Sequence, residues 1–250
     1  MSASEFAAKS YKTRGLVLRT HKLGEADRII SLLTPEHGLV RAVAKGVRRT
    51  SSKMGATLEP FMEIDAQLVH GRNLDVFTQA QLRHSYGLAL AADYDAYMAA
   101  NAMVETAERL CEGEEDAVAP QYRLLHGAIA ALARGAGDPG SLLDSYLLRA
   151  LSTAGWAPSF TTCVNCGEPG PHDSLNIALG GVVCRACRPP GSQSPAPETI
   201  ALLAALLTGD WPVAAASEPR TRRAAATIVA GYVQWHLEKV VKSLKLVERT

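Results

Sequence analysis

Aromatic residues, long apolar runs and an excess of charge are all missing from this sequence of 250 residues. Phe, Tyr and Trp make up 6% of it, so any surface that stacks on nucleic-acid bases must use few rings. The longest stretch without a charge, Ala150–Gly167, includes Pro158 and many polar residues, which excludes a membrane-spanning helix. Residues 1–5 (MSASE) lack the basic and apolar regions of a signal peptide. We therefore expect a cytoplasmic protein with no membrane partner.

Nucleotide-binding and hydrolase motifs are absent as well. The sequence contains no G-x-x-x-x-G-K-[ST], no G-x-G-x-x-G, no G-x-S-x-G and no H-E-x-x-H, the patterns that bind phosphates or carry hydrolytic chemistry. The first 82 residues contain no carboxylate cluster with metal-ligand spacing. The sequence therefore predicts a protein that is not an enzyme.

The net charge of +1 hides an uneven distribution. Residues 1–80 carry 12 Lys and Arg against 8 Asp and Glu, whereas residues 81–160 carry 5 against 10. The apolar fraction of 47% is that of an ordinary globular protein. An excess of cations at one end of a folded chain is typical of a nucleic-acid surface.

Short runs of β-branched and apolar residues fill the first 82 residues. Between residues 61 and 69, Met62, Ile64, Ala66 and Leu68 alternate with polar residues, as in a half-buried strand. We predict five strands, over residues 13–20, 28–34, 39–45, 61–69 and 74–82. Five strands in so short a segment favour an OB-fold barrel.

From about Ser85 the apolar period becomes helical. We predict helices over residues 94–111, 120–134, 141–155, 198–207 and 221–247. In the third, Ser141 is the predicted N-cap and Asp144 stands at the capping-box position. His236 continues the apolar stripe of the last helix, and Cys111 ends that of the first, so both are predicted to be packed residues without a chemical role.

Four of the five cysteines form two close pairs, Cys163-x-x-Cys166 and Cys184-x-x-Cys187, seventeen residues apart. Two such hairpins supply the four thiolates of a tetrahedral Zn²⁺ site. Four thiolates leave no open coordination position, so this zinc is expected to be structural. A redox pair would need a βαβ pattern, which is missing here, and disulfides are disfavoured in a reducing compartment.

These elements together predict an α+β protein, in which an N-terminal five-stranded OB-fold barrel precedes a helical domain with an inserted four-cysteine zinc ribbon. We expect an OB-fold nucleic-acid-binding domain over residues 1–82. Residues 83–162 form the first part of the helical domain, 163–190 the zinc ribbon and 191–250 the second part of the helical domain.

A basic segment follows the third predicted strand. Lys45, Arg48, Arg49 and Lys53 lie within nine residues, and Arg41 shares strand parity with Lys45. Such a patch beside an OB-fold is typical of a single-strand-binding track, and Gly46 permits a close approach of the backbone to phosphates. These five cations are the predicted nucleic-acid contacts, although a solvated loop has the same composition. Phe61 and Phe77 have the parity of exposed stacking rings, but packing at the barrel end is the favoured interpretation for each.

Four segments of the N-terminal part carry a family resemblance. They are Gly24–Ile30 (GEADRII), Thr34–Gly38 (TPEHG), Arg41–Arg49 (RAVAKGVRR) and Leu58–Phe61 (LEPF). With the helices and the four-cysteine segment behind them, the sequence resembles the RecO family of bacterial DNA repair proteins over essentially its whole length.

The resemblance implies a recombination mediator of the RecF/RecO/RecR route. Members bind single- and double-stranded DNA, anneal complementary strands and help to load RecA onto strands coated by single-strand-binding protein, whose acidic tail they dock. RecR is an implied partner and RecF a further one. The resemblance gives DNA contact to Arg41, Lys45, Arg48 and Arg49, and zinc to the four paired cysteines, which some members lack.

Two other classes of function stay open. OB-folds and zinc ribbons also serve RNA-binding factors of translation and transcription, and a comparison of DNA with RNA of equal length separates these from a DNA mediator. A zinc hydrolase is disfavoured because its metal needs an open position, which four cysteines do not leave.

Overall fold

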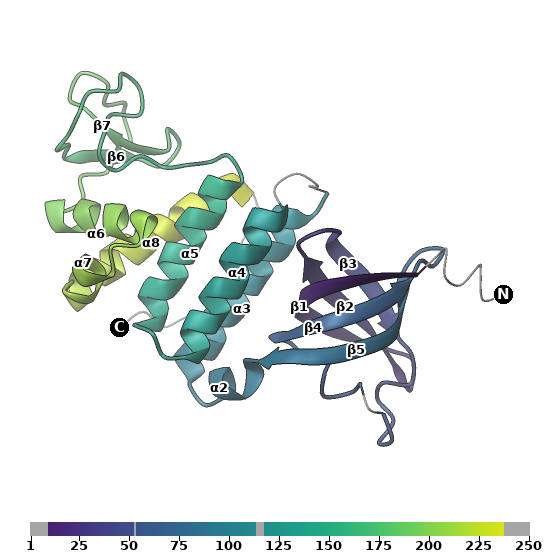
Figure 1. Cartoon of the computed structure of the whole chain (residues 1–250). Coiled ribbons are helices and arrows are strands. Elements are labelled where there is room, and N and C mark those ends of the chain that lie inside the picture. The colour runs from purple at the N-terminus through teal and green to yellow at the C-terminus, as the bar shows by residue number, and fades with distance from the viewer. Residues whose placement is uncertain (1–9, 53, 114–117, 238–250) are drawn as a thin grey trace. The chain divides into compact units, whose positions relative to one another are not determined.

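The computed structural model describes residues 10–52, 54–113 and 118–237 (Figure 1). They fall into two compact units, one within Met1–Asp93 and Cys111–Ala133 and the other within Tyr94–Leu110 and Arg134–Thr250. Of the helices that the structure describes, none is long and apolar enough to cross a bilayer. The domain boundaries after residues 82, 162 and 190 stay a prediction.

All five predicted strands are present in the first unit, and they close into a barrel in the order β1-β2-β3-β5-β4 (Figure 1). Their bounds are β1 Ser10–Leu23, β2 Asp27–Thr34, β3 Gly38–Ala44, β4 Met62–Val69 and β5 Asp75–Ser85. Neighbouring strands pair antiparallel, except that β3 and β5 pair in parallel through Ala42 and Val43. The parallel pair closes the barrel.

The barrel core follows the predicted alternation. Ile64, Ala66 and Leu68 of β4 are buried together with the apolar side chains of the other strands. Phe61 and Phe77 are 2% and 4% exposed, so both rings pack in the interior, as favoured, and neither is available to stack on a base. The outward parity of β4 carries the polar residues Glu63, Asp65 and Gln67.

The predicted helices are confirmed with small shifts of their ends. In the first unit lie α2 (Gly87–Ala91) and α4 (Val118–Ala133), and in the second α3 (Tyr94–Cys111), α5 (Pro139–Thr153), α6 (Pro197–Thr208), α7 (Trp211–Ala215) and α8 (Pro219–Leu237). The short helices α2 and α7 have no counterpart in the prediction. The predicted end of the last helix, from residue 238 on, lies outside the described residues.

The predicted cap of α5 is wrong. Its N-cap is Asp138, whose side chain accepts a hydrogen bond from the backbone N–H of Ser141 at 2.8 Å. Pro139 follows at the first helical position, where its fixed φ suits the helix and its missing N–H leaves no donor unsatisfied. Asp144 is therefore not a capping-box residue, and its side chain is buried at 3% exposure.

Helices α5, α6 and α8 contact one another pairwise and form the core of the second unit. Ser145 of α5 donates to the carbonyl of Leu206 in α6 at 2.7 Å. His236 lies against Trp156, with ring centroids 5.0 Å apart, and burial lowers its pKa. It is thus a packed residue, as the sequence predicts. The two-stranded sheet of β6 (Ser174–Asn176) and β7 (Gly181–Val183) belongs to the same unit.

Candidate nucleic-acid interface and metal centre

The predicted basic loop leaves the barrel directly after β3. Arg41, on the outward parity of β3, and Lys45, Arg48 and Arg49 in the loop are all exposed. In the described part of the chain none of these four cations forms an ion pair. Their charge is thus available to a polyanion. Lys53, the fifth predicted contact, lies outside the described residues.

Hydrogen bonds hold this loop against the turn between β1 and β2. The backbone N–H of Arg48 donates to the carbonyl of Ala26 at 2.9 Å, and its guanidinium donates to the carbonyl of Gly24 at 3.0 Å. Gly46 has a φ of +64°, which favours glycine. Its N–H donates to the Asp27 carboxylate at 2.7 Å, so this N–H has a partner within the protein. The approach of the loop backbone to a phosphate stays a prediction.

The same loop continues into the wall of a groove on the first unit, with a volume of about 1250 Å³. Its lining includes Ser52 and Met54 of the loop, the cations Lys12, Arg14 and Arg123, and the amides Gln67, Gln79 and Gln81. Asp65, also in the lining, lies 3.5 Å from Arg14 and 2.8 Å from Arg83. These guanidinium groups, Arg83 first, lower the pKa of Asp65 and offset its charge.

The groove was not predicted from the sequence. Lys12 and Arg14 stand in β1 and Arg123 in α4, more than 100 residues later. The one sequence signal for the groove was the outward parity of the polar residues Asp65 and Gln67, which indicates a solvent-exposed face of the barrel. The only aromatic lining residue, Tyr122, is 6% exposed, so the described groove offers charges and amides to a strand and no exposed ring.

The two predicted cysteine pairs meet in the second unit. Their four Sγ atoms all lie within 4.8 Å of one another, and those of Cys166 and Cys184 are 3.8 Å apart. Four sulfurs at about 2.3 Å from a tetrahedral Zn²⁺ are separated by about 3.8 Å. The donor set and its spacing therefore fit zinc, which would be held by Cys163, Cys166, Cys184 and Cys187.

Tight turns and backbone N–H groups shape this cluster. Gly167 has a φ of +77°, and its N–H donates to the carbonyl of Cys163 at 2.8 Å. Backbone N–H groups of Cys184 and Cys166 stabilise the Cys163 thiolate and lower its pKa to about 6. At Cys184 the backbone N–H of Cys187 lowers the pKa, but burial and the neighbouring thiols outweigh it and raise the pKa to about 12. Four crowded thiols thus do not ionise together until a cation neutralises them.

A thiol count tests this arrangement. In metal-loaded native protein we expect no rapidly reacting thiol among the five cysteines, because metal protects four and burial raises the pKa of Cys111 to about 11. A strong chelator should release four reactive thiols, and denaturant should add the fifth. Colorimetric titration with an aromatic disulfide measures each step. Fast labelling of Cys111 in the native state would contradict its burial.

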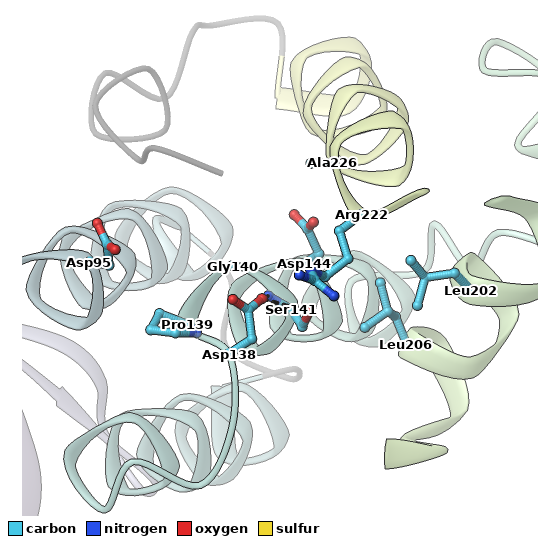
Figure 2. Close-up of a pocket in the computed structure, with 10 residues that line it drawn as sticks. All are labelled: Asp95, Asp138, Pro139, Gly140, Ser141, Asp144, Leu202, Leu206, Arg222 and Ala226. Atoms are coloured by element: carbon cyan, nitrogen blue, oxygen red, sulfur yellow. Dashed lines mark hydrogen bonds between the residues drawn. The ribbon is translucent and has the colours of Figure 1, made fainter. Parts of the chain in front are cut away.

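A small hollow of about 20 Å³ lies among the helices of the second unit. Figure 2 shows Arg222 of α8, Asp144 of α5 and Leu206 of α6 in its lining, together with Asp95 and Asp138. Three carboxylates outnumber the one guanidinium, and the volume admits about one water molecule. An acidic peptide is therefore not expected to bind in this cavity.

Known proteins match this chain over almost its entire length. Residues 8–86 match the family model described as Recombination protein O N terminal, and residues 91–245 match Recombination protein O C terminal. The chain is 54% identical over 239 residues to the DNA repair protein RecO of Thermobifida fusca (strain YX), covering 96% of this chain and 98% of that protein. It is 52% identical over 242 residues to DNA repair protein RecO of Nocardioides sp. (strain ATCC BAA-499 / JS614), covering 96% and 99%.

Proposed function

Since this chain belongs to the RecO family of DNA repair proteins, we propose that it is a DNA-binding recombination mediator that anneals complementary strands. In this role it acts on chromosomal DNA in the cytoplasm. It helps to load RecA onto strands coated by single-strand-binding protein, together with RecR and with RecF as a further partner of the same route. It works by binding and not by making or breaking covalent bonds.

One observation carries the proposal: four exposed cations on and beside the barrel form no ion pair in the described part of the chain. The described groove on the same unit offers no exposed aromatic ring for stacking on bases. The closed five-stranded barrel, in the order β1-β2-β3-β5-β4, supports the predicted OB-fold. An OB-fold binds oligonucleotides partly through the loop between its first two strands. The basic loop is hydrogen-bonded to that loop at Gly24 and Ala26. Arg41, Lys45, Arg48 and Arg49, with Lys53 on the sequence pattern, are the proposed DNA contacts.

The mechanism follows from the kind of contact. Lys and Arg bind phosphates and release counterions, so the repulsion between two strands falls. Bases that are not stacked on protein rings stay free to pair with a second strand. Annealing by this route needs no ATP.

We further propose that the four cysteines bind Zn²⁺ in a structural role. Four thiolates complete the tetrahedral shell, so no position is left for water or a substrate. The chemistry that the ion supplies is cross-linking of the two cysteine hairpins, and the DNA contacts proposed above lie in the other compact unit.

Strand annealing tests the proposed function. Two complementary DNA strands, one with a fluorophore and one with a quencher, are expected to pair at least tenfold faster with the protein than without it, with or without ATP. Pre-binding of single-strand-binding protein should block spontaneous pairing, and the protein with RecR should restore it. An RNA pair of the same sequence is the control. Faster annealing of RNA than of DNA would favour the alternative, an RNA-binding factor of translation or transcription.

A further inference from the structure

A buried carboxylate lies on the outward face of the barrel and belongs to neither the basic loop nor the groove lining. Glu63 of β4 has the same outward parity as Asp65 and Gln67, yet its side chain is only 4% exposed. Two histidines reach it from other elements, His84 from β5 and His126 from α4. His84 is the register partner of Glu63 across the β4–β5 ladder.

The three side chains present their donor atoms to one point. Nδ1 of His84 lies 2.5 Å from Oε2 of Glu63, and Nε2 of His126 lies 3.5 Å from the same oxygen. One ligand atom from each residue falls within 4.8 Å of the other two. Two imidazole nitrogens and one carboxylate oxygen are a ligand set for a divalent transition metal.

One tyrosine orients the carboxylate, as outer-shell residues do in metal sites. The Tyr122 hydroxyl donates to Oε1 of Glu63 at 3.0 Å and leaves Oε2 to the histidines. The Tyr86 hydroxyl lies 2.9 Å from Nε2 of His126, the nitrogen that faces Glu63, so this contact is given up when that nitrogen binds an ion. The rings of Tyr122 and His126, one helical turn apart in α4, stack with an interplanar angle of 1°. Burial raises the pKa of Glu63, but hydrogen bonds from His84 and Tyr122 help to hold that pKa below its usual value.

We propose that Glu63, His84 and His126 form a second metal site, which binds Zn²⁺ or a similar divalent transition ion through one oxygen and two nitrogens. The bound ion joins the β4–β5 hairpin to helix α4. It differs in donor chemistry from the four-cysteine cluster, and all three ligands belong to the first compact unit. Tyr122 and Arg123 of the same helix line the groove, so the ion also fixes that part of the groove wall.

Distances indicate how the ion enters. Tetrahedral ligands at about 2.0–2.1 Å from zinc are about 3.3 Å apart. The separation of 3.5 Å between His126 and Glu63 is close to this value, whereas the 2.5 Å separation of His84 and Glu63 is that of a hydrogen bond. The His84 side chain is 57% exposed, so it has room to turn and open this contact, and the ion takes the place of the shared proton.

Zinc titration of the full-length chain tests the site. Protein whose four-cysteine cluster is already filled, and which has been cleared of weakly bound metal, is titrated with Zn²⁺ by calorimetry near pH 7.5. We expect a second equivalent to bind to the wild type, at least tenfold more weakly to His84→Asn, and not at all to the double variant His84→Asn/His126→Asn. His21→Asn, an exposed histidine of β1, is the matched control and should bind like the wild type. Co²⁺ in the second site should lack thiolate charge-transfer absorption.

The cluster has one simpler interpretation, a hydrogen-bonded imidazolium–carboxylate pair without a metal. In that case the wild type binds no zinc beyond the ion already held by the four cysteines. His84→Asn then lowers thermal stability equally with and without added Zn²⁺. Either result overturns the proposal. The exposed position of His84 keeps the test valid should substitution of buried Glu63 prevent folding. Because the readout is metal stoichiometry, failure of this site leaves the proposed DNA function untouched.

Discussion

The triple variant Lys45→Glu, Arg48→Glu, Arg49→Glu is expected to bind DNA about 100-fold more weakly near physiological salt, on all sequences alike. The three side chains are exposed and form no ion pair in the described part of the chain, so their charges act on the phosphates directly. Each lost phosphate contact lowers the slope of log affinity against log salt by about 0.7–0.9. Fluorescence anisotropy over a salt series should thus show the slope reduced by about 2–3.

A matched control separates this local effect from the change in net charge. Arg134→Glu, Arg149→Glu, Arg220→Glu reverses three exposed cations of the second unit and changes the net charge by the same amount. We expect it to keep most of the wild-type affinity and slope. Wild-type binding by the basic-loop variant at low salt would remove the DNA assignment of Lys45, Arg48 and Arg49.

Removal of the metal is expected to unfold the cysteine module and leave the barrel intact. The apolar cluster around the cysteines is small: Cys163, Val183 and Cys184, with Val164 and Cys187 packed against it. The two strands of the segment have three residues each, and its other buried apolar residues are Phe160, Leu175 and Val182. Structural zinc in small modules contributes an apparent free energy of about 10–16 kcal/mol near pH 7, far more than so small an apolar cluster supplies. Cys184→Ser, or chelation, should therefore abolish protection from hydrogen exchange over residues 159–194.

The barrel provides the internal reference for that experiment. Its closed ladder and its own buried core lie in the other compact unit, so exchange there and DNA binding are expected to change little. Cys111→Ala, at a buried thiol outside the cluster, is the matched control and should keep the module folded. A module that stays protected without metal would show that zinc does not stabilise it.

Local sequence determined most of the secondary structure. The alternation of Ile64, Ala66 and Leu68 indicated a strand with one buried face, and the helical period of residues 94–111 gave the bounds of α3. The cap of α5 failed because Asp138 and Ser141 are both good N-cap residues three positions apart. The local signal that distinguishes them is Pro139, which suits the first helical position directly after Asp138.

The sequence alone also determined the cysteine cluster. Each Cys-x-x-Cys pair is a local hairpin, so the cluster needs only one long-range contact, between the two hairpins. The tertiary structure decided the rest. Glu63, His84 and His126 come from two strands and a helix and have no mutual spacing that a motif describes, and Lys12 and Arg123 share a groove only after the barrel closes. Period and turn chemistry act over a few residues, while the convergence of distant side chains depends on how whole elements pack.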